Sequence, residues 1–417
     1  YELKQLQPSA DVVVLEAEDV AHGASGRNGG FAMTLLDMSL HHLVQNHGEE
    51  AAKKAHDAVA AAVHEIGQIA DSEGIDCDYH LGGLLVVATN PAQEARLEKD
   101  LEAAQRLGLQ TIKALSAEEV RKEVNSPTYR AALFEEDCAV LHPAKLARGL
   151  ADVLEGKGVA IYEDSPVVDL RAEAGSLKLV TPKGSVEAPK ALVCTNAWAY
   201  RLAPFRRKIV PLYTYVILTE PLTAKHIESI GWGRRQGIED KRNYVHYYRL
   251  TADNRILWGG SDGMVYRDLG IRPSYDRCEP IFQKLEQTFR RTFPQLEDLR
   301  FTHRWGGPVA MTPTFVPIYG SLKEGTIHYG LGCNGHGVAP ARLGGKILAD
   351  LATDNDRGTR DLFFVHGKEL QFPPQPLCWI GAEATRRALL AQDAAMDSGR
   401  EGGDMDPWLL KVLRKLG

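Results

Sequence analysis

The sequence predicts an α/β plus α+β fold, in which a parallel sheet of the dinucleotide-binding type is interleaved with a second, strand-rich domain and followed by a helical tail. Three observations carry this prediction: an apolar strand that ends on Glu16, two glycine clusters at residues 23–30 and 330–337, and a strand-rich middle from Val210 to Met264. The length of 417 residues suits two to three domains, and 44% hydrophobic residues can build a sizeable core.

Charge and cysteine usage narrow the class of partner. The 49 lysines and arginines against 55 aspartates and glutamates give a net charge of −6, which excludes a strong positive field for nucleic acid. The six cysteines form no C-x-x-C pair, which favours a reducing, cytoplasmic setting. The longest compact apolar run, residues 84–88, is far shorter than the ~20 residues of a membrane span. We therefore expect a cytoplasmic protein that acts on a small molecule.

The first predicted strand covers residues 11–16 and follows a helix end at residues 1–7 that Pro8 breaks. Its sequence, DVVVLE, is typical of a parallel strand buried on both faces. In a dinucleotide-binding unit, an acid at the end of the second strand accepts hydrogen bonds from a ribose, about 20 residues after a glycine-rich turn. Glu16 suits this role. We expect the first strand and its glycine turn to be missing from the front of this sequence, where about 20 to 30 residues would supply them.

A long helical zone is expected from Ser39 to Ser72, because this stretch contains little glycine or proline. It carries five histidines, at positions 41, 42, 47, 56 and 64. They form no H-x-x-x-H pair, and the nearby carboxylates do not repeat with ligand spacing. We expect a solvated helix face and no metal site.

Short strands and helices alternate through the rest of the chain. Ser116 and Glu119 form a capping-box pattern, and His142-Pro143 starts a further helix. Residues 181–184 (TPKG) are typical of a turn between two strands. Strands are predicted at 84–89, 159–162, 167–170, 177–180, 191–195 and 326–329, and helices at 92–107, 144–155, 278–293 and 339–351.

The tail changes character. Residues 372–376 (FPPQP) predict an extended linker, followed by a helix at 382–395, a flexible stretch at 398–403 and a short helix that begins at Pro407. The terminal helix is basic and amphipathic, as in helices that lie on a membrane surface. Docking on its own chain, or on a second copy to form a homodimer, is favoured over that membrane contact.

The first glycine cluster is GASGRNGG at residues 23–30, directly after the strand that ends on Glu16. Four glycines let a ligand approach the backbone, and Ser25, Arg27 and Asn28 offer donors to pyrophosphate and ribose oxygens. An ordinary flexible loop is the alternative. The position after a ribose-type acid favours nucleotide contact.

The second cluster, GLGCNGHG at residues 330–337, precedes a predicted helix. It matches G-x-G-x-x-G, but the acid twenty residues on, Asp350, lies inside that helix rather than at the end of a strand. The cluster still predicts a glycine turn that presents a helix N-terminus to an anion or an electron-rich carbonyl.

A third match is GGSDG at residues 259–263, which fits the G-x-S-x-G elbow of serine hydrolases with Ser261 as nucleophile. That elbow needs a helix directly after the serine, and no helical apolar stripe follows here. We favour a hairpin turn at Asp262-Gly263.

In this order, the clusters resemble the D-amino-acid-oxidase-like (DAO) family of FAD-dependent amine oxidoreductases, in particular its gamma-glutamylputrescine oxidoreductase branch. The resemblance runs from Tyr1 to about Leu351. The matching stretches are VVVLEAE (12–18), GASGRNGG (23–30), HPAKLARGLA (142–151), ALVCTNAWA (191–199), YVILTEPL (215–222), RILWGGSDG (255–263), RWGGPVAMTP (304–313) and GCNGHGVAPARLGGKILADL (332–351).

The resemblance implies two interleaved domains and a tail. The expected parts are a Rossmann-like, FAD-binding parallel sheet from residues 1–80, 140–209 and 310–365, a substrate domain around an antiparallel sheet from residues 81–139 and 210–309, and a helical tail at 366–417.

The resemblance also implies which residues bind FAD. Glu16 would hold the adenosine ribose, Val167 the adenine, and Thr195 and Asn196 the pyrophosphate side. The helix N-terminus after the second glycine cluster would face the pyrimidine end of the flavin, where hydride transfer builds negative charge. The implied cofactor-binding residues are Glu16, Ser25, Gly26, Arg27, Asn28, Gly29, Gly30, Val167, Thr195, Asn196, Gly307, Gly332, Gly335, His336, Gly337 and Val338.

The implied chemistry is oxidation of an amine to an imine, with transfer of a hydride equivalent to FAD, hydrolysis of the imine to a carbonyl compound, and reoxidation by O2 or another acceptor. An aromatic wall would hold the amine or its cation, with Tyr215, Tyr248, His246 and Trp305 as the predicted catalytic residues. The alternative for each is that it only packs the sheet. A serine hydrolase and a flavin-free binding module are the alternative functions.

Two positions depart from the family pattern. Relatives that oxidise simple α-amino acids carry an arginine where this chain has Val309, and sarcosine oxidases attach flavin through a cysteine where it has Gly307. The resemblance therefore implies non-covalent FAD and an alkyl amine or modified amino compound without the usual α-carboxylate anchor.

Overall fold

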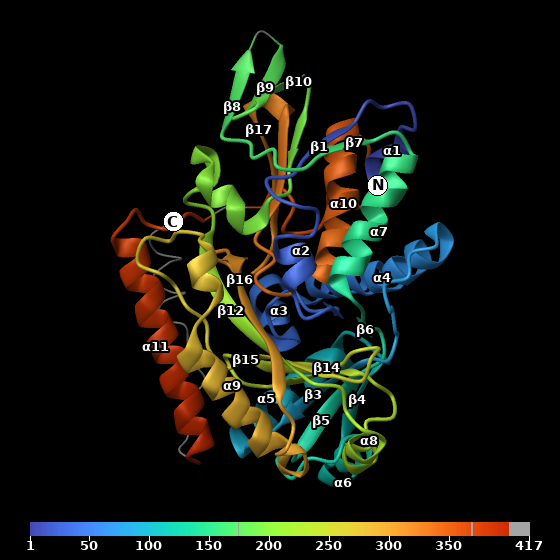
Figure 1. Cartoon of the computed structure of the whole chain (residues 1–417), viewed down its shortest axis with the longest axis vertical. Helices are drawn as coiled ribbons and strands as arrows, with labels where there is room; N and C mark the ends of the chain where they lie inside the picture. The colour runs from blue at the N-terminus through green and yellow to red at the C-terminus, as the bar shows by residue number, and fades with distance from the viewer. Residues whose placement is uncertain (174, 368–369, 400–417) are drawn as a thin grey trace.

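The structure, a computed structural model, describes residues 1–173, 175–367 and 370–399 (Figure 1). Its largest element is an eight-stranded sheet of order β16-β12-β15-β14-β13-β3-β5-β4. Neighbouring strands run antiparallel except for β13 and β3, which are parallel. The strands are β3 (Leu84–Ala88), β4 (Ile112–Leu115), β5 (Ala131–Glu135), β12 (Val210–Thr219), β13 (Gly237–Asp240), β14 (His246–Leu250), β15 (Ile256–Gly260) and β16 (Phe301–Met311).

Short parallel pieces form the other half of the molecule. Strands β1 and β7 pair in parallel, as do β11 and β18, and β17 flanks β18 antiparallel. Segments far apart in the sequence therefore lie side by side, with helices packed against them (Figure 1). These elements are α1 (Glu2–Leu6), β1 (Val13–Leu15), α4 (Glu49–Glu73), α7 (Pro143–Gly156), β7 (Ala160–Tyr162), β11 (Ala191–Val193), β17 (Ile318–Leu322), β18 (Ile327–Leu331) and α10 (Val338–Thr353).

The expected burial of the strand at residues 11–16 is wrong. Val13 and Val14 are each 37% exposed. Among the described strands β1 bonds only to β7, and β1 and β11 belong to separate sheets. The second edge of β1 and its apolar side chains are therefore open to solvent.

The long helical zone is two helices rather than one. Gly48, at φ 83°, separates α3 (Leu40–His47) from α4. The predicted solvated face is wrong for His56, which is 5% exposed, with its Nε2 3.0 Å from Glu135 Oε1. Among the described residues no group of three or more His, Cys, Asp or Glu is arranged to hold a metal ion.

The capping patterns are confirmed. Ser116 and Glu119 form a reciprocal capping box at the start of α6 (Ala117–Glu123), and the His142 side chain accepts a hydrogen bond from the backbone N–H of Lys145 at the start of α7. Residues 181–184 turn between two antiparallel strands, as predicted. The other elements are α2 (Ala24–Arg27), β2 (Phe31–Ala32), α5 (Pro91–Arg106), β6 (Ala139–Val140), β8 (Asp169–Glu173), β9 (Ser176–Thr181), β10 (Gly184–Ala188) and α8 (Ala224–Ile230).

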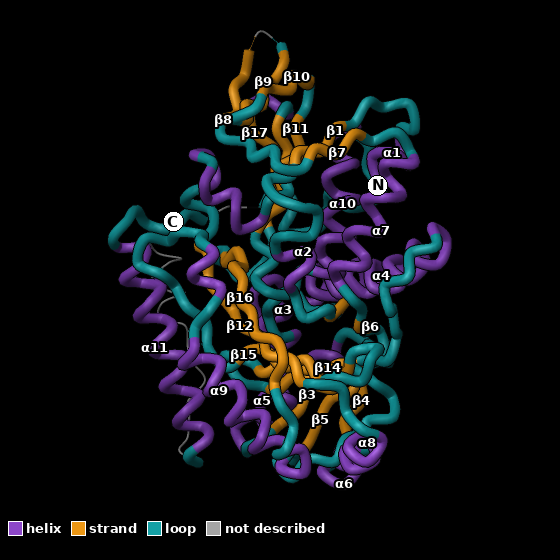
Figure 2. Tube along the Cα trace, viewed as in Figure 1, coloured by secondary structure: helices purple, strands orange, loops and turns teal. Residues whose placement is uncertain are grey.

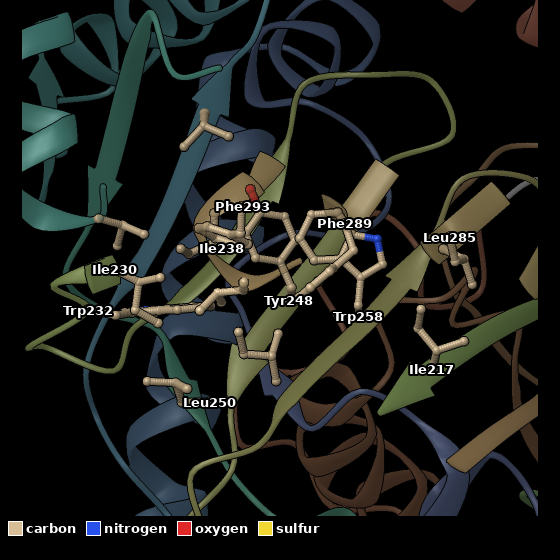
Figure 3. Close-up of a cluster of buried hydrophobic side chains, with 14 of the residues drawn as sticks. Ile217, Ile230, Trp232, Ile238, Tyr248, Leu250, Trp258, Leu285, Phe289 and Phe293 are labelled. Atoms are coloured by element: carbon tan, nitrogen blue, oxygen red, sulfur yellow. The ribbon is translucent and has the colours of Figure 1, made fainter. Parts of the chain in front are cut away.

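One face of the large sheet is covered by α9 (Glu279–Thr292), and an aromatic core lies between them (Figures 2 and 3). Tyr248 stacks on Trp258 with ring centroids 4.1 Å apart, and Phe289 and Phe293 meet the Trp258 ring edge-on. Large aromatic side chains bury much apolar area, so this face provides a large share of the packing that stabilises the domain.

Part of the predicted tail is a long helix, α11 (Leu377–Asp397), which lies beside the large sheet (Figure 1). Its Asp393 accepts hydrogen bonds from the backbone N–H groups of Asn243 and Tyr244, and its Arg386 pairs with Asp262. This helix therefore docks on its own chain. The predicted terminal helix from Pro407 lies outside the described residues. No described helix has the length and apolar character to cross a membrane.

Candidate functional site

Two predicted site residues lie at the carboxyl ends of parallel strands. Glu16 follows β1, and its Oε1 accepts a 3.1 Å hydrogen bond from the backbone N–H of Glu18. Asn196 follows β11 and accepts a 3.0 Å hydrogen bond from the N–H of Gly332, which follows β18. Thr195, directly before Asn196, is exposed. Ligands of open α/β sheets bind outside these carboxyl ends, so the arrangement suits a nucleotide.

The glycine turn before α10 is held by a residue that the sequence reasoning missed. Asn334 is 4% exposed; its Nδ2 donates to the carbonyl of Gly332, and its Oδ1 accepts from the N–H of Thr312 at the end of β16. Its own N–H donates to the carbonyl of Ala310. Asn334 therefore fixes the turn to the large sheet. Its position inside the glycine cluster was the only signal for it in the sequence.

The turn presents the N-terminus of α10, with Gly337 at the N-cap and Val338 as the first helical residue. Gly335 adopts φ +100°, and a Cβ built there would have no atom within 4 Å. An open, side-chain-free turn before a 16-residue helix leaves free N–H groups and the positive end of the dipole accessible. The predicted anion or carbonyl site is therefore sterically available.

His336 lies in the same turn and faces a partly buried acid, Asp37. Its Nδ1 is 3.0 Å from Asp37 Oδ1. Burial alone would lower the pKa of His336, but Asp37 and the charge of Glu239 outweigh it, and the pKa is raised. Asp37 thus favours the protonated form of the imidazole beside the N-terminus of α10.

The first glycine cluster is a tightly packed turn around α2. A Cβ on Gly26 would lie 2.1 Å from the carbonyl oxygen of Ala21, and one on Gly30, at φ +75°, 2.0 Å from that of Leu141. Asn28 closes the turn, since its Oδ1 accepts from the N–H of Gly30. The glycines are therefore required by backbone packing as well as by any ligand.

The donors of this cluster are used unequally. Ser25 is exposed, whereas the Arg27 guanidinium is paired with Asp276 at 2.5 Å and lies 2.9 Å from His22 Nε2. The indole N–H of Trp305 on β16 donates to the carbonyl of Arg27 at 2.9 Å. In this arrangement Arg27 connects the glycine cluster to the large sheet.

Gly307 lies two residues after Trp305, on the same face of β16. A Cβ built on Gly307 would meet only Arg27 Cδ, at 3.6 Å. The position therefore has room for a side chain, and it carries none to which a flavin could be attached.

Tyr215, Tyr248 and His246 lie on the opposite face of the sheet, and the structure does not support them as an aromatic wall open to a ligand. Tyr215 is 0% and Tyr248 2% exposed in the core beside α9. The Tyr248 hydroxyl lies 2.6 Å from that of Tyr129, and His246 Nδ1 lies 2.8 Å from Asp240 Oδ2. The alternative, that these residues pack the sheet, describes their positions.

Tyr247, which the sequence reasoning passed over, faces the glycine cluster instead. A Cβ on Gly29 would lie 3.0 Å from the Tyr247 ring, and Tyr247 remains partly exposed. Burial raises its pKa to about 12, so it is a neutral hydroxyl at neutral pH. Strand alternation was the missed signal, because Tyr247 must point away from its neighbours His246 and Tyr248.

Arg249 is a second missed residue on this face. It is 5% exposed, and its Nε donates a 2.5 Å hydrogen bond to the carbonyl of Gly29. Burial lowers its pKa to about 10. This hydrogen bond holds the first glycine cluster against the large sheet.

Two further predictions concern residues away from this face. Val167 lies in the loop before β8, not in the strand expected at 167–170. Ser261 has φ +71° and is 4% exposed, but no helix follows it and no hairpin forms at Asp262-Gly263, so both the elbow and the predicted hairpin are wrong. The serine-hydrolase alternative loses its structural basis.

Comparison with known proteins agrees with this geometry. The family model "FAD dependent oxidoreductase" (DAO) matches residues 1–351. The chain is a member of the DAO family of FAD-dependent oxidoreductases. It is 35% identical over 393 residues to gamma-glutamylputrescine oxidoreductase of Escherichia coli K12, covering 94% of this chain and 87% of that protein.

Solved structures show the same fold. Glycine oxidase from Geobacillus kaustophilus superimposes with a TM-score of 0.70 at 18% identity, covering 86% of this chain and 91% of the other. L-α-glycerophosphate oxidase from Mycoplasma pneumoniae, solved with FAD bound, gives 0.67 at 16% identity, covering 84% and 91%. The predicted fold class is confirmed, and FAD is the cofactor of the family.

The described residues fit FAD. The open turn at Gly335 and the α10 N-terminus suit the electron-rich edge of a flavin, and the acid after β1 suits a ribose. When bound, FAD accepts a hydride equivalent from the substrate.

Proposed function

We propose that this protein oxidises the C–N bond of an amine with non-covalently bound FAD. The observation that carries the proposal is the 35% identity to gamma-glutamylputrescine oxidoreductase over 94% of the chain. Bound FAD would take up the hydride equivalent that leaves the substrate carbon as the C=N bond forms, and water would hydrolyse that C=N bond to a carbonyl compound and an amine or ammonia. The electrons then pass to O2 or to another acceptor.

The site's residues have supporting roles in this proposal. With FAD bound, the N-terminus of α10 and the neighbouring His336 would stabilise negative charge at the flavin edge. Tyr247 and Trp305 form the sheet side of the substrate space, and Arg27 and Arg249 hold the first glycine cluster against that sheet.

Non-covalent attachment and the substrate class follow from two positions on β16. Gly307 offers no thiol, and Val309 brings no cation to hold an α-carboxylate. We therefore propose a primary or secondary alkyl amine, or a modified amino compound, in which the oxidised carbon does not bear a carboxylate.

The test is spectroscopic. Full-length protein is expected to be yellow and to bleach when mixed anaerobically with its amine, and denaturation is expected to release all the flavin. The panel comprises polyamines, gamma-glutamylated amines, N-methyl amines and aminophosphonates. Protein that stays colourless after incubation with FAD contradicts the proposal, and flavin that remains attached after denaturation contradicts non-covalent binding.

The other predicted partners and the setting remain predictions. A homodimer through the tail depends on residues 400–417, which lie outside the described part of the chain. The cytoplasmic setting depends on cysteine usage alone.

A further inference from the structure

Glu239 lies on the face of the large sheet that fronts the glycine clusters. In the sheet register it stands between Val86 on β3 and Tyr247 on β14. Tyr247 approaches Gly29 of the first cluster, and the charge of His336, from the second cluster, acts on Glu239. The neighbour Ile238 points into the aromatic core on the other face. The Glu239 side chain therefore lies on the same side of the sheet as Tyr247, which faces the first glycine cluster.

Six other ionisable groups of this region form three pairs. Lys241 Nζ lies 2.5 Å from Asp100 Oδ2, His336 Nδ1 lies 3.0 Å from Asp37 Oδ1, and His56 Nε2 lies 3.0 Å from Glu135 Oε1. Arg249, on the same face, instead donates hydrogen bonds to the backbone carbonyls of Gly29 and Leu250.

Glu239 is an acid of this region that belongs to none of these pairs. The residue is 4% exposed, and its carboxyl group has no hydrogen-bond or ion-pair partner among the described residues. Burial raises its pKa. A buried carboxylate without a partner is destabilising by several kcal/mol in its ionised form, and a cation that reaches it removes that cost.

The space beside this region suits an alkyl chain. A cavity of about 40 Å³ lies between the sheet and residues 34–43. Val86 and Lys241, which flank Glu239 across and along the sheet, are among its lining residues, although Glu239 itself is not. The rest of the lining combines apolar side chains such as Leu36, Met38 and Leu133 with the paired polar side chains of His56, Asp100 and Glu135. The apolar part suits a methylene chain, and the carboxyl group of Glu239, beside Val86 on the same face of the sheet, suits an ammonium group at the end of that chain.

We propose that Glu239 binds the ammonium group of a diamine substrate, at the end remote from the C–N bond that is oxidised. This inference rests on the proposed function for its location and names the substrate class. It also explains how an amine is held at a site where Val309 offers no anchor for a carboxylate. The remote ammonium takes that anchoring role, with Glu239 as the specificity-determining residue.

The test compares 1,4-diaminobutane with butylamine, which has the same chain but one amine. Binding to the FAD-loaded protein is measured by calorimetry under anaerobic conditions. One charge-assisted contact corresponds to about a ten- to hundredfold difference in affinity. The wild type is expected to prefer the diamine by that factor, and Glu239→Gln to lose the preference while binding butylamine as before.

Glu136→Gln is the matched control, since it removes an exposed carboxylate that pairs with Lys113. It is expected to leave both affinities unchanged. If Glu239→Gln does not fold, Glu239→Asp replaces it, and its shorter side chain is expected to shift the preference towards 1,5-diaminopentane. Equal affinities of wild type for both amines, or a diamine preference that survives at Glu239→Gln, overturns the inference.

The result is separable from that of the proposed function. If amines bleach the flavin and Glu239→Gln has no effect, amine oxidation is supported and the role of Glu239 in diamine binding is contradicted. If diamine binding depends on Glu239 but no amine bleaches the flavin, the role of Glu239 is supported and amine oxidation is contradicted.

Discussion

The two faces of the large sheet are built from alternate residues of the same strands, and they differ in polarity and in exposure to solvent. The face beside α9 is apolar and closed, with Tyr215, Tyr248 and Trp258 at most 2% exposed. The face beside the glycine clusters carries Glu239, Tyr247, Arg249 and Trp305. The role of an aromatic residue on these strands can therefore be assigned only when the face of the sheet on which its side chain lies is known. One residue further along the strand, the surroundings change from the aromatic core to the side that faces the glycine clusters.

The largest effect is expected on the closed face. Trp258→Ala removes the ring that Tyr248, Phe289 and Phe293 pack against, and such truncations destabilise by about 3–5 kcal/mol. Urea unfolding measures the change. The matched variant on the other face is Trp305→Ala, whose indole is only partly buried, and it is expected to be markedly less destabilising. Equal losses would contradict the difference between the faces.

Neighbouring acids on β13 are expected to respond oppositely to pH. Burial would raise the pKa of Asp240, but His246 and Arg242 outweigh it and lower that pKa, whereas the pKa of Glu239 is raised by burial. Ionised Asp240 thus stabilises the fold at pH values above its unfolded pKa of about 3.9, and this stabilisation is lost as the pH falls. Ionised Glu239 has the opposite effect: it destabilises the fold progressively as the pH rises above about 4.3 and through the folded pKa of Glu239.

At neutral pH Asp240→Asn is therefore expected to cost about 3 kcal/mol, because it removes the carboxylate that contacts His246 and one of the two carboxylates that pair with Arg242. Glu239→Gln is expected to gain stability relative to wild type as pH rises from 4.5 to 7.5. Urea titrations at both pH values check the signs. A wild-type-like pH dependence in Glu239→Gln would contradict the assignment.

Two glycines of the turn before α10 allow a test that separates close backbone packing from contact with a ligand. A Cβ on Gly332, at φ +76°, would lie 2.0 Å from Thr312 Cγ2, whereas one on Gly335 would meet no atom. Gly332→Ala is expected to displace the turn and weaken FAD binding at least tenfold, and Gly335→Ala to show only the strain of its backbone, about 1 kcal/mol. Flavin fluorescence titration measures both. Stronger impairment in Gly335→Ala would place the ligand directly against that residue.

The smallest effects are expected from adjacent tyrosines. Tyr248→Phe loses the hydrogen bond to Tyr129 and about 1 kcal/mol of stability, with no change in the flavin spectrum. Tyr247→Phe is expected to shift the flavin absorbance or the KM for amine while changing stability less. A spectral change in Tyr248→Phe but not in Tyr247→Phe would reverse the assignment of the two faces.

The sequence predicted the elements better than it predicted their surroundings. The capping box at Ser116, the helix start at Pro143 and the glycine turn before α10 depend on contacts within a few residues, so local patterns were sufficient. The exposure of Val13 and the burial of His56 depend on which distant strand or acid lies alongside. Those predictions were therefore wrong.

The candidate site divides in the same way. The glycine clusters and Glu16 could be proposed from the sequence, since they are contiguous motifs in a chain that matches a family over residues 1–351. The choice of Tyr215, Tyr248 and His246 failed because residue type was used without strand phase. Asn334 and Arg249 were missed because their partners, Thr312 and Gly29, lie far away in the sequence.

The sequence by itself determined the family, its cofactor and the glycine turns, because glycine and capping patterns act over short distances. Only the tertiary structure decided which face of the large sheet fronts those turns. Among the described residues, it also left the Glu239 carboxyl group without a partner, since charge pairing in that region joins residues up to about 300 positions apart, as with Asp37 and His336.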